Sequence, residues 1–112
     1  MTTDLAAEAL RTVARGDAIA NDCVVPYYLA DVKRRISVAR VADRLYAFDD
    51  LCTCADRSCP LSGGLLTGTT LMCQCHGSRF DITTGAVIKG PATEALHVHE
   101  VQEVDGDVRI RV

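Results

Sequence analysis

The most informative segment of the chain is Cys73-Gln74-Cys75-His76-Gly77-Ser78-Arg79-Phe80-Asp81, in which Cys73 and His76 form a C-x-x-H pair. A second pair of soft ligands, C-x-C at Cys52 and Cys54, lies upstream, with one predicted strand between the two pairs. Adjacent loops of a β-sheet can bring such pairs together, so the sequence supplies four ligands for one metal centre. Thiolate and imidazole suit zinc, copper and iron–sulfur centres, and ligand type alone leaves the choice among them open.

The residues around these pairs form short β-branched or apolar runs separated by turn residues, a pattern typical of an all-β sandwich or barrel. Asp105-Gly106 predicts a two-residue hairpin turn, because glycine adopts positive φ at little cost, and Ala42-Asp43 is expected to form another. Residues 49–64 and 73–78 are least like strands, and these two loops hold the ligand pairs. The predicted strands are residues 23–29, 35–41, 44–48, 68–72, 86–88, 95–101 and 108–112.

The length of the chain, 112 residues, allows one domain with a modest core and is too short for two. We therefore expect a single domain over residues 10–112, preceded by an N-terminal arm of residues 1–9. Residues 4–11 have helical composition, but a segment this short is marginal for a stable helix. They are expected to form an arm or a short helix.

Composition excludes several classes of partner. A net charge of −3 and an aromatic content of 4% offer neither a basic footprint for phosphates nor stacking platforms for bases, so no nucleic acid partner is expected. Asp4 and Glu8 interrupt the pattern of an export signal, and no apolar run reaches the roughly 18 residues that a membrane span needs. A cytoplasmic protein without a membrane partner is expected. The cytoplasm keeps most thiols reduced, so six cysteines in this chain point to metal or redox chemistry.

Three features together carry a family resemblance. The stretch 73–81 is followed by Thr84-Gly85 and by Gly90-Pro91-Ala92-Thr93, while residues 44–53 and Pro60-Leu61-Ser62 fit the approach to a first ligand loop. Over roughly residues 10–112 the chain closely resembles Rieske-type [2Fe–2S] domains. The resemblance implies the Rieske fold, an antiparallel β-sandwich or barrel-like base with a two-loop cluster-binding subdomain over about residues 49–82. It also implies a [2Fe–2S] cluster as cofactor.

In that family the first loop carries C-x-H and the second C-x-x-H, with both cysteines on an inner iron and both histidines on an outer one. The resemblance implies that Cys52 and Cys73 hold the inner iron and His76 the outer. Cys54 stands where the family has its other histidine. We interpret Cys54 as the fourth ligand; the alternative is a site that has lost a ligand and its cluster. A third thiolate makes the centre more negative, which predicts a potential below the roughly −150 to +300 mV of Rieske centres, towards about −400 mV.

Residues around the ligands are expected to tune the centre. Ser78 is a candidate hydrogen-bond donor to a cluster sulfur. Phe80 stands where high-potential respiratory Rieske proteins place a tyrosine, and it has no hydroxyl to donate. Pro91 lies in what resembles the loop that covers the cluster in the family. Cys59 and Cys75 correspond roughly to the cysteines that form a disulfide in respiratory Rieske proteins, and the sequence leaves open whether they are bonded or free here.

Two further groups of residues have simpler interpretations. His97 and His99 share one face of a predicted strand and can in principle chelate a metal, but a solvated sheet face is the expectation. The basic run Lys33-Arg34-Arg35 is expected to be a solvated turn.

The function that this resemblance implies is single-electron transfer from a flavin-dependent ferredoxin reductase to an oxygenase or another acceptor. The sequence contains no convincing nucleophile, acid–base pair or phosphate loop, so no catalytic residue is assigned and the chain is not expected to be an enzyme by itself. The alternatives are an iron–sulfur or redox-sensing regulator, a structural zinc site with a Cys₃His ligand set, and a cluster-free Rieske-like subunit.

Overall fold

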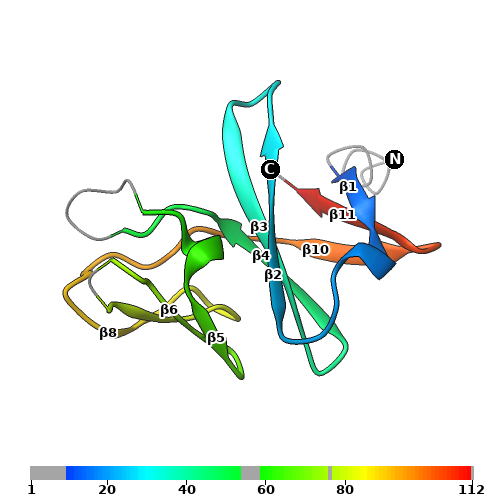
Figure 1. Cartoon of the computed structure of the whole chain (residues 1–112). Coiled ribbons are helices and arrows are strands. Elements are labelled where there is room, and N and C mark those ends of the chain that lie inside the picture. Colours follow the sequence, from blue (N-terminus) through cyan, green and yellow to red (C-terminus); the bar gives the residue numbers. More distant parts are fainter. Residues whose placement is uncertain (1–9, 54–58, 76, 112) are drawn as a thin grey trace.

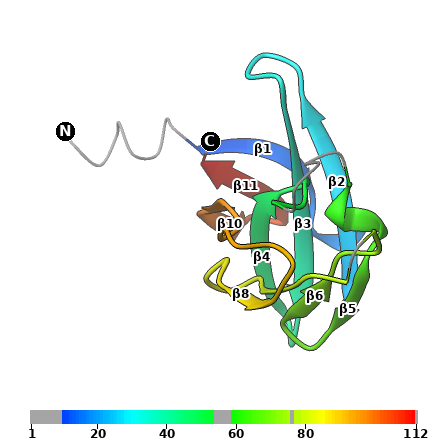
Figure 2. The ribbon, with the colours of Figure 1, turned by 90° about the vertical axis from the view of Figure 1, so that its left-hand side faces the viewer.

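The structure is a computed structural model that describes residues 10–53, 59–75 and 77–111. Within these ranges the chain forms three sheets in which every paired strand is antiparallel to its neighbour. Figures 1 and 2 show that β2, β3 and β4 lie between the other two sheets. The described residues contain no candidate membrane-spanning helix.

The central sheet has the order β2 (Cys23–Leu29), β3 (Arg34–Val41), β4 (Arg44–Asp49) and β9 (Val98–His99). The second sheet has the order β1 (Leu10–Arg15), β11 (Asp107–Arg111) and β10 (Val101–Val104). The third sheet has the order β5 (Leu65–Thr67), β6 (Thr70–Met72), β7 (Arg79–Asp81) and β8 (Val87–Lys89). Two short 3₁₀ helices, η1 (Gly16–Ala18) and η2 (Leu61–Gly63), lie in connections between strands.

Both predicted two-residue hairpin turns are confirmed. Ala42 and Asp43 have φ values of 51° and 67° and join β3 to β4. Asp105 and Gly106 have φ values of 53° and 81° and join β10 to β11. Positive φ at both central residues matches the right-handed twist of the flanking strands, which is why these dipeptides specify the register of their hairpins.

Several elements differ from the prediction. Leu10 and Arg11 belong to strand β1, so the described end of the segment 4–11, expected to form an arm or a short helix, is a strand, because pairing with the edge of β11 overrides local propensity. The predicted strand 95–101 is divided instead, since β9 pairs with β4 in one sheet and β10 with β11 in another. The strands β5 and β7, with three residues each, lie outside the predicted strand segments.

The core consists of two clusters on the two faces of the central sheet. Successive side chains of a strand point to opposite faces, so Val38 and Ala47 belong to one cluster while Ala39 and Phe48 belong to the other. The cluster with Val38 and Ala47 includes Val108 and Ile110 of β11. The second packs against the third sheet and contains Leu61, Leu71, Phe80, Cys52 and Cys73. The two predicted ligand cysteines are therefore part of the core that attaches the third sheet to the central one.

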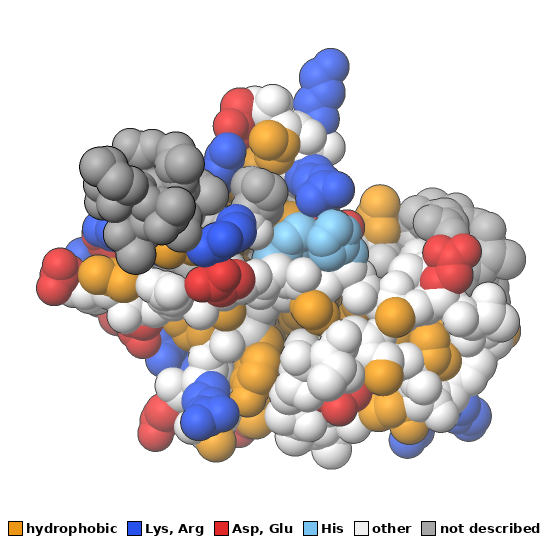
Figure 3. All heavy atoms as spheres, turned by 180° about the vertical axis from the view of Figure 1, so that it is seen from behind, with side chains coloured by type: hydrophobic (Ala, Val, Ile, Leu, Met, Phe, Trp, Pro, Cys, Tyr) orange, Lys and Arg blue, Asp and Glu red, His pale blue; other side chains and the backbone are white. Residues whose placement is uncertain are grey.

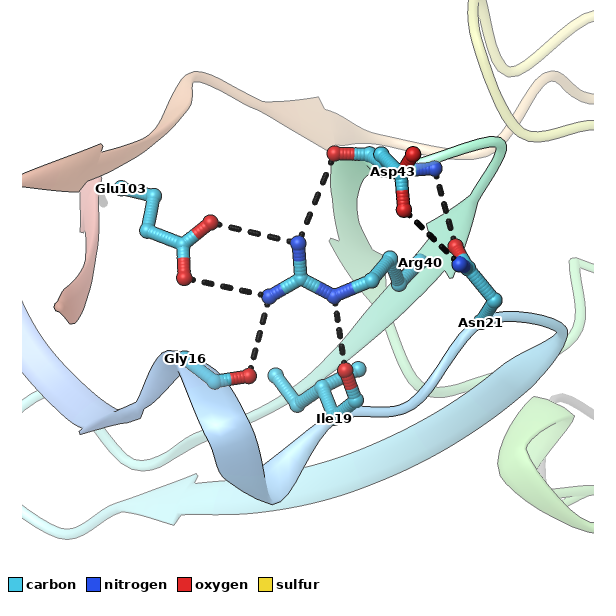
Figure 4. A network of polar contacts seen from close by, with 6 residues as sticks. All are labelled: Gly16, Ile19, Asn21, Arg40, Asp43 and Glu103. Atoms are coloured by element: carbon cyan, nitrogen blue, oxygen red, sulfur yellow. Dashed lines mark hydrogen bonds and ion pairs between the residues drawn. The ribbon is translucent and has the colours of Figure 1, made fainter.

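Arg40 on β3 ties the central sheet to the second sheet (Figure 4). Its guanidinium donates to both carboxylate oxygens of Glu103 at 3.2 Å and to the backbone carbonyl oxygens of Ile19 at 2.7 Å and Gly16 at 2.9 Å. A bidentate pair of this kind fixes orientation as well as distance. The contact holds the connection around η1 against β3.

Candidate metal centre

The described parts of the two ligand loops leave the sheets beside each other. The first follows β4 and leads to η2, and the second joins β6 to β7. Cys52 and Cys73 are both fully buried and belong to one core cluster. Cys54 and His76, the other two predicted ligands, lie outside the described residues.

Backbone hydrogen bonds shape the second loop around Cys73. The N–H of Cys73 donates to the carbonyl of Ser78 at 2.7 Å, and the N–H of Gly77 donates to the carbonyl of Cys73 at 3.0 Å. Gly77 has a φ of 77°, a left-handed conformation that favours glycine. The turn thus depends on glycine immediately after the predicted ligand His76.

Asp50 anchors the base of the first loop and was not identified as a site residue from the sequence. Its carboxylate is fully buried and accepts hydrogen bonds from the Ser37 hydroxyl at 2.6 Å, the Ser62 N–H at 2.7 Å and the Ser62 hydroxyl at 3.1 Å. It also forms an ion pair with Arg35. A buried carboxylate is costly unless it is paired in this way. The only sequence signal was an acidic residue between a strand and the first ligand cysteine.

A disulfide between Cys59 and Cys75 joins the two loops, with their Cα atoms 6.4 Å apart. The sequence had left this pairing open. The sulfurs of Cys59, Cys73 and Cys75 all lie within 4.8 Å of one another. In addition, the N–H of Cys52 donates to the carbonyl of Cys59 at 2.9 Å, so the disulfide lies beside both Cys52 and Cys73.

A third loop, containing Pro91, packs against the second. The Ala92 N–H donates to the Ser78 hydroxyl oxygen at 3.0 Å, and both residues are buried, whereas Pro91 is exposed. The Thr53 hydroxyl donates to the carbonyl of Glu94, which ties the same loop to the first one. Ser78 therefore positions the proline loop. Phe80 is fully buried in the core cluster with Cys52 and Cys73.

A hollow of about 390 Å³ opens beside Cys52. Basic residues contribute to its wall, and Figure 3 shows histidine side chains at the surface with Lys or Arg side chains beside them. The lining residues are Lys33, Arg34, Arg35, Asp49, Leu51, Cys52, Thr53, Glu94, Ala95 and His97.

The expectation of a solvated face is wrong for His99. Its side chain is 3% exposed, and its Nε2 lies 2.7 Å from Oδ1 of Asp49. Although burial acts to raise the pKa of Asp49, the hydrogen bond to His99 and the charges of His99 and Arg34 together hold that pKa below its ordinary value. His97, whose side chain is 59% exposed, stacks on the His99 ring.

Comparison with known proteins identifies the family. The profile of the Rieske [2Fe-2S] domain matches residues 10–103, and the chain belongs to this family. The predicted all-β Rieske fold is confirmed, and the [2Fe–2S] cluster of the family is the cofactor of this chain. The donor set fits that cofactor, because two buried thiols from adjacent loops converge on one core cluster and thiolates are ligands of iron–sulfur centres.

Three relatives are closely similar. Ferredoxin CarAc of Metapseudomonas resinovorans is 39% identical over 75 residues, covering 67% of this chain and 68% of that protein. The anthranilate 1,2-dioxygenase ferredoxin subunit of Burkholderia cepacia is 35% identical over 80 residues, covering 71% and 72%. A ferredoxin solved in complex with the oxygenase of carbazole 1,9a-dioxygenase superposes with a TM-score of 0.82 at 28% identity, covering 92% of this chain and 93% of that one.

Proposed function

We propose that this chain is the ferredoxin of an oxygenase system, taking single electrons from a flavin-dependent ferredoxin reductase and passing them to an oxygenase. The observation that carries the proposal is the burial of Cys52 and Cys73 in one core cluster at two adjoining loops of a Rieske domain. The related proteins from Metapseudomonas resinovorans and Burkholderia cepacia are ferredoxins by name, so the chain is an electron carrier and not a catalytic enzyme. The cytoplasm is its proposed location.

The proposed ligands are Cys52, Cys54, Cys73 and His76. A bound [2Fe–2S] cluster supplies one-electron chemistry. Cys52 and Cys73 would hold the inner iron away from water, since both are fully buried. Cys54 and His76 would hold the outer iron. Three thiolates place one more negative charge on the centre than two thiolates and two imidazoles do, which supports a potential below that of Rieske centres with two histidines.

The surrounding residues would keep the two loops together and limit access by water. The Cys59–Cys75 disulfide links the loops, and Ser78 holds the proline loop through Ala92. Ser78 also remains our candidate donor to a cluster sulfur. Phe80 presents an apolar ring to the same core cluster, and this lack of a hydroxyl donor supports a low potential. Exposed Pro91 would form part of the surface that a redox partner contacts.

The test is anaerobic purification followed by iron, sulfide and zinc analysis and by EPR spectroscopy of the reduced protein. We expect two irons and two sulfides per chain, with g-values between those of two-histidine and all-cysteine clusters. Stopped-flow mixing of the reduced protein with an oxygenase such as that of the carbazole 1,9a-dioxygenase system would then show oxidation of the carrier. A colourless protein that contains only zinc would refute both the cluster and the carrier role.

A further inference from the structure

Asp49, His97 and His99 bring three donor groups together beside the cluster loops. Asp49 ends β4, and its N–H donates to the carbonyl of His97 at 3.0 Å, so the two residues lie across from each other at the sheet edge. His97 and His99 are two positions apart along extended chain and share the face of Asp49. The pairing of β4 with β9 therefore brings Asp49, His97 and His99 together.

The donor atoms are already close to one another. Nε2 of His99 lies 2.7 Å from Oδ1 of Asp49, and Nδ1 of His97 lies 4.0 Å from Oδ2. One nitrogen or oxygen from each residue falls within a group whose members are all within 4.8 Å. The two rings are stacked, with centroids 4.6 Å apart and planes inclined by 18°. The side chains need small adjustments to point at one ion.

An ion can reach this group from solvent. Asp49 and His97 line the hollow of about 390 Å³ described above, and the His99 side chain, 3% exposed, contacts Asp49. Binding therefore requires no unfolding of the β4–β9 pair.

We propose that Asp49, His97 and His99 form a second metal site, which binds a divalent first-row transition-metal ion such as zinc and is separate from the cluster ligands. Two imidazoles and one carboxylate suit zinc and its neighbours, whereas calcium and magnesium prefer all-oxygen sets. The bound ion cross-links β4 to β9. These strands lead into the first ligand loop and away from the proline loop, so the ion stabilises the frame around the cluster.

Arg34 sets the expected strength of the site. Its positive charge acts on the Asp49 carboxylate and helps to lower the pKa of that group. The same charge opposes a cation at the site, so replacing Arg34 with an uncharged residue is expected to strengthen metal binding. Arg35 matters less, because it forms an ion pair with buried Asp50.

The experiment is equilibrium dialysis of the cluster-loaded protein against buffered free zinc, with zinc and iron counted in the same sample. We expect one zinc per chain with no loss of iron, and a higher thermal unfolding temperature when zinc is bound. His97→Ala should weaken zinc binding by about tenfold or more, since one of three protein ligands is lost. Arg34→Gln should strengthen it. His97 is a better choice for replacement than His99, because the His97 side chain is exposed and that of His99 is buried.

Asp107→Asn is the matched control, since it removes one carboxylate that pairs with Arg15 on the second sheet, and it should bind zinc as the unmodified protein does. Equal zinc affinity in the protein with and without His97→Ala would overturn the proposal. So would zinc uptake that is matched by loss of iron, because the ion would then occupy the cluster cysteines.

Discussion

The Ser37 hydroxyl donates a hydrogen bond of 2.6 Å to the Asp50 carboxylate, and both residues are fully buried. The contact joins the middle of β3 to the start of the first ligand loop. Ser62, on the far side of that loop, donates to the same carboxylate. One buried side chain thus holds both ends of the loop that carries Cys52.

Asp50→Ala is expected to destabilise the protein by roughly 3 kcal/mol, because it leaves the buried Ser37 hydroxyl and the partly buried donors of Ser62 without their acceptor. Urea unfolding of the cluster-loaded protein measures the change. The iron content should fall as well, since the base of the loop is released. Asp107→Asn, at an exposed ion pair, is the control and should change stability by about 0.5 kcal/mol or less. Equal effects of the two variants on stability would show that Asp50 does not anchor the loop.

Cys54→His should raise the midpoint potential by on the order of 100 mV or more, because an imidazole replaces a thiolate and the centre loses one negative charge. A redox titration followed by EPR measures this, and the g-values should move towards those of two-histidine centres. Cys23→Ser changes an exposed cysteine on β2 and should leave the potential unaltered. An unchanged potential in Cys54→His would show that Cys54 is not a ligand.

Arg40→Lys should cost about 1–2 kcal/mol in the free energy of unfolding, because a lysine cannot reproduce the forked contact with Glu103 or reach the carbonyls of Ile19 and Gly16 together. Chemical denaturation gives the value. The comparison is Arg15→Lys, whose side chain is 66% exposed in its pair with Asp107. That substitution should cost about 0.5 kcal/mol or less. Similar losses at both arginines would contradict the special role of Arg40.

We expect the folded protein to lose stability at alkaline pH because of Tyr27. Burial raises the pKa of its phenol above the ordinary value of 10.0, so the folded protein disfavours the phenolate. The resulting stability is present below pH 10.0 and declines as the pH rises through the raised pKa of the folded state. Unfolding measured across this range should show the decline, and Tyr27→Phe should reduce it. Tyr28→Phe, at a residue that is 64% exposed, is the matched control. An unchanged decline in Tyr27→Phe would contradict the prediction.

Local chemistry explains what could be predicted. The stretch 73–81 carries its ligands and turn residues at fixed spacing, so it identified the family without reference to distant residues. The hairpins at Ala42-Asp43 and Asp105-Gly106 were predictable for a similar reason, since a two-residue turn depends on the φ preferences of its own residues.

Tertiary structure alone decided the roles of Asp50, Arg40 and His99. Each depends on a partner distant in sequence: Asp50 on Ser37 and Ser62, Arg40 on Glu103, and His99 on Asp49. A charged or polar side chain has the same local pattern whether it is solvated or buried, and only the folded chain supplies the group that makes burial favourable. The cluster-binding family and the turns follow from local sequence, whereas long-range packing selects the polar side chains that support them.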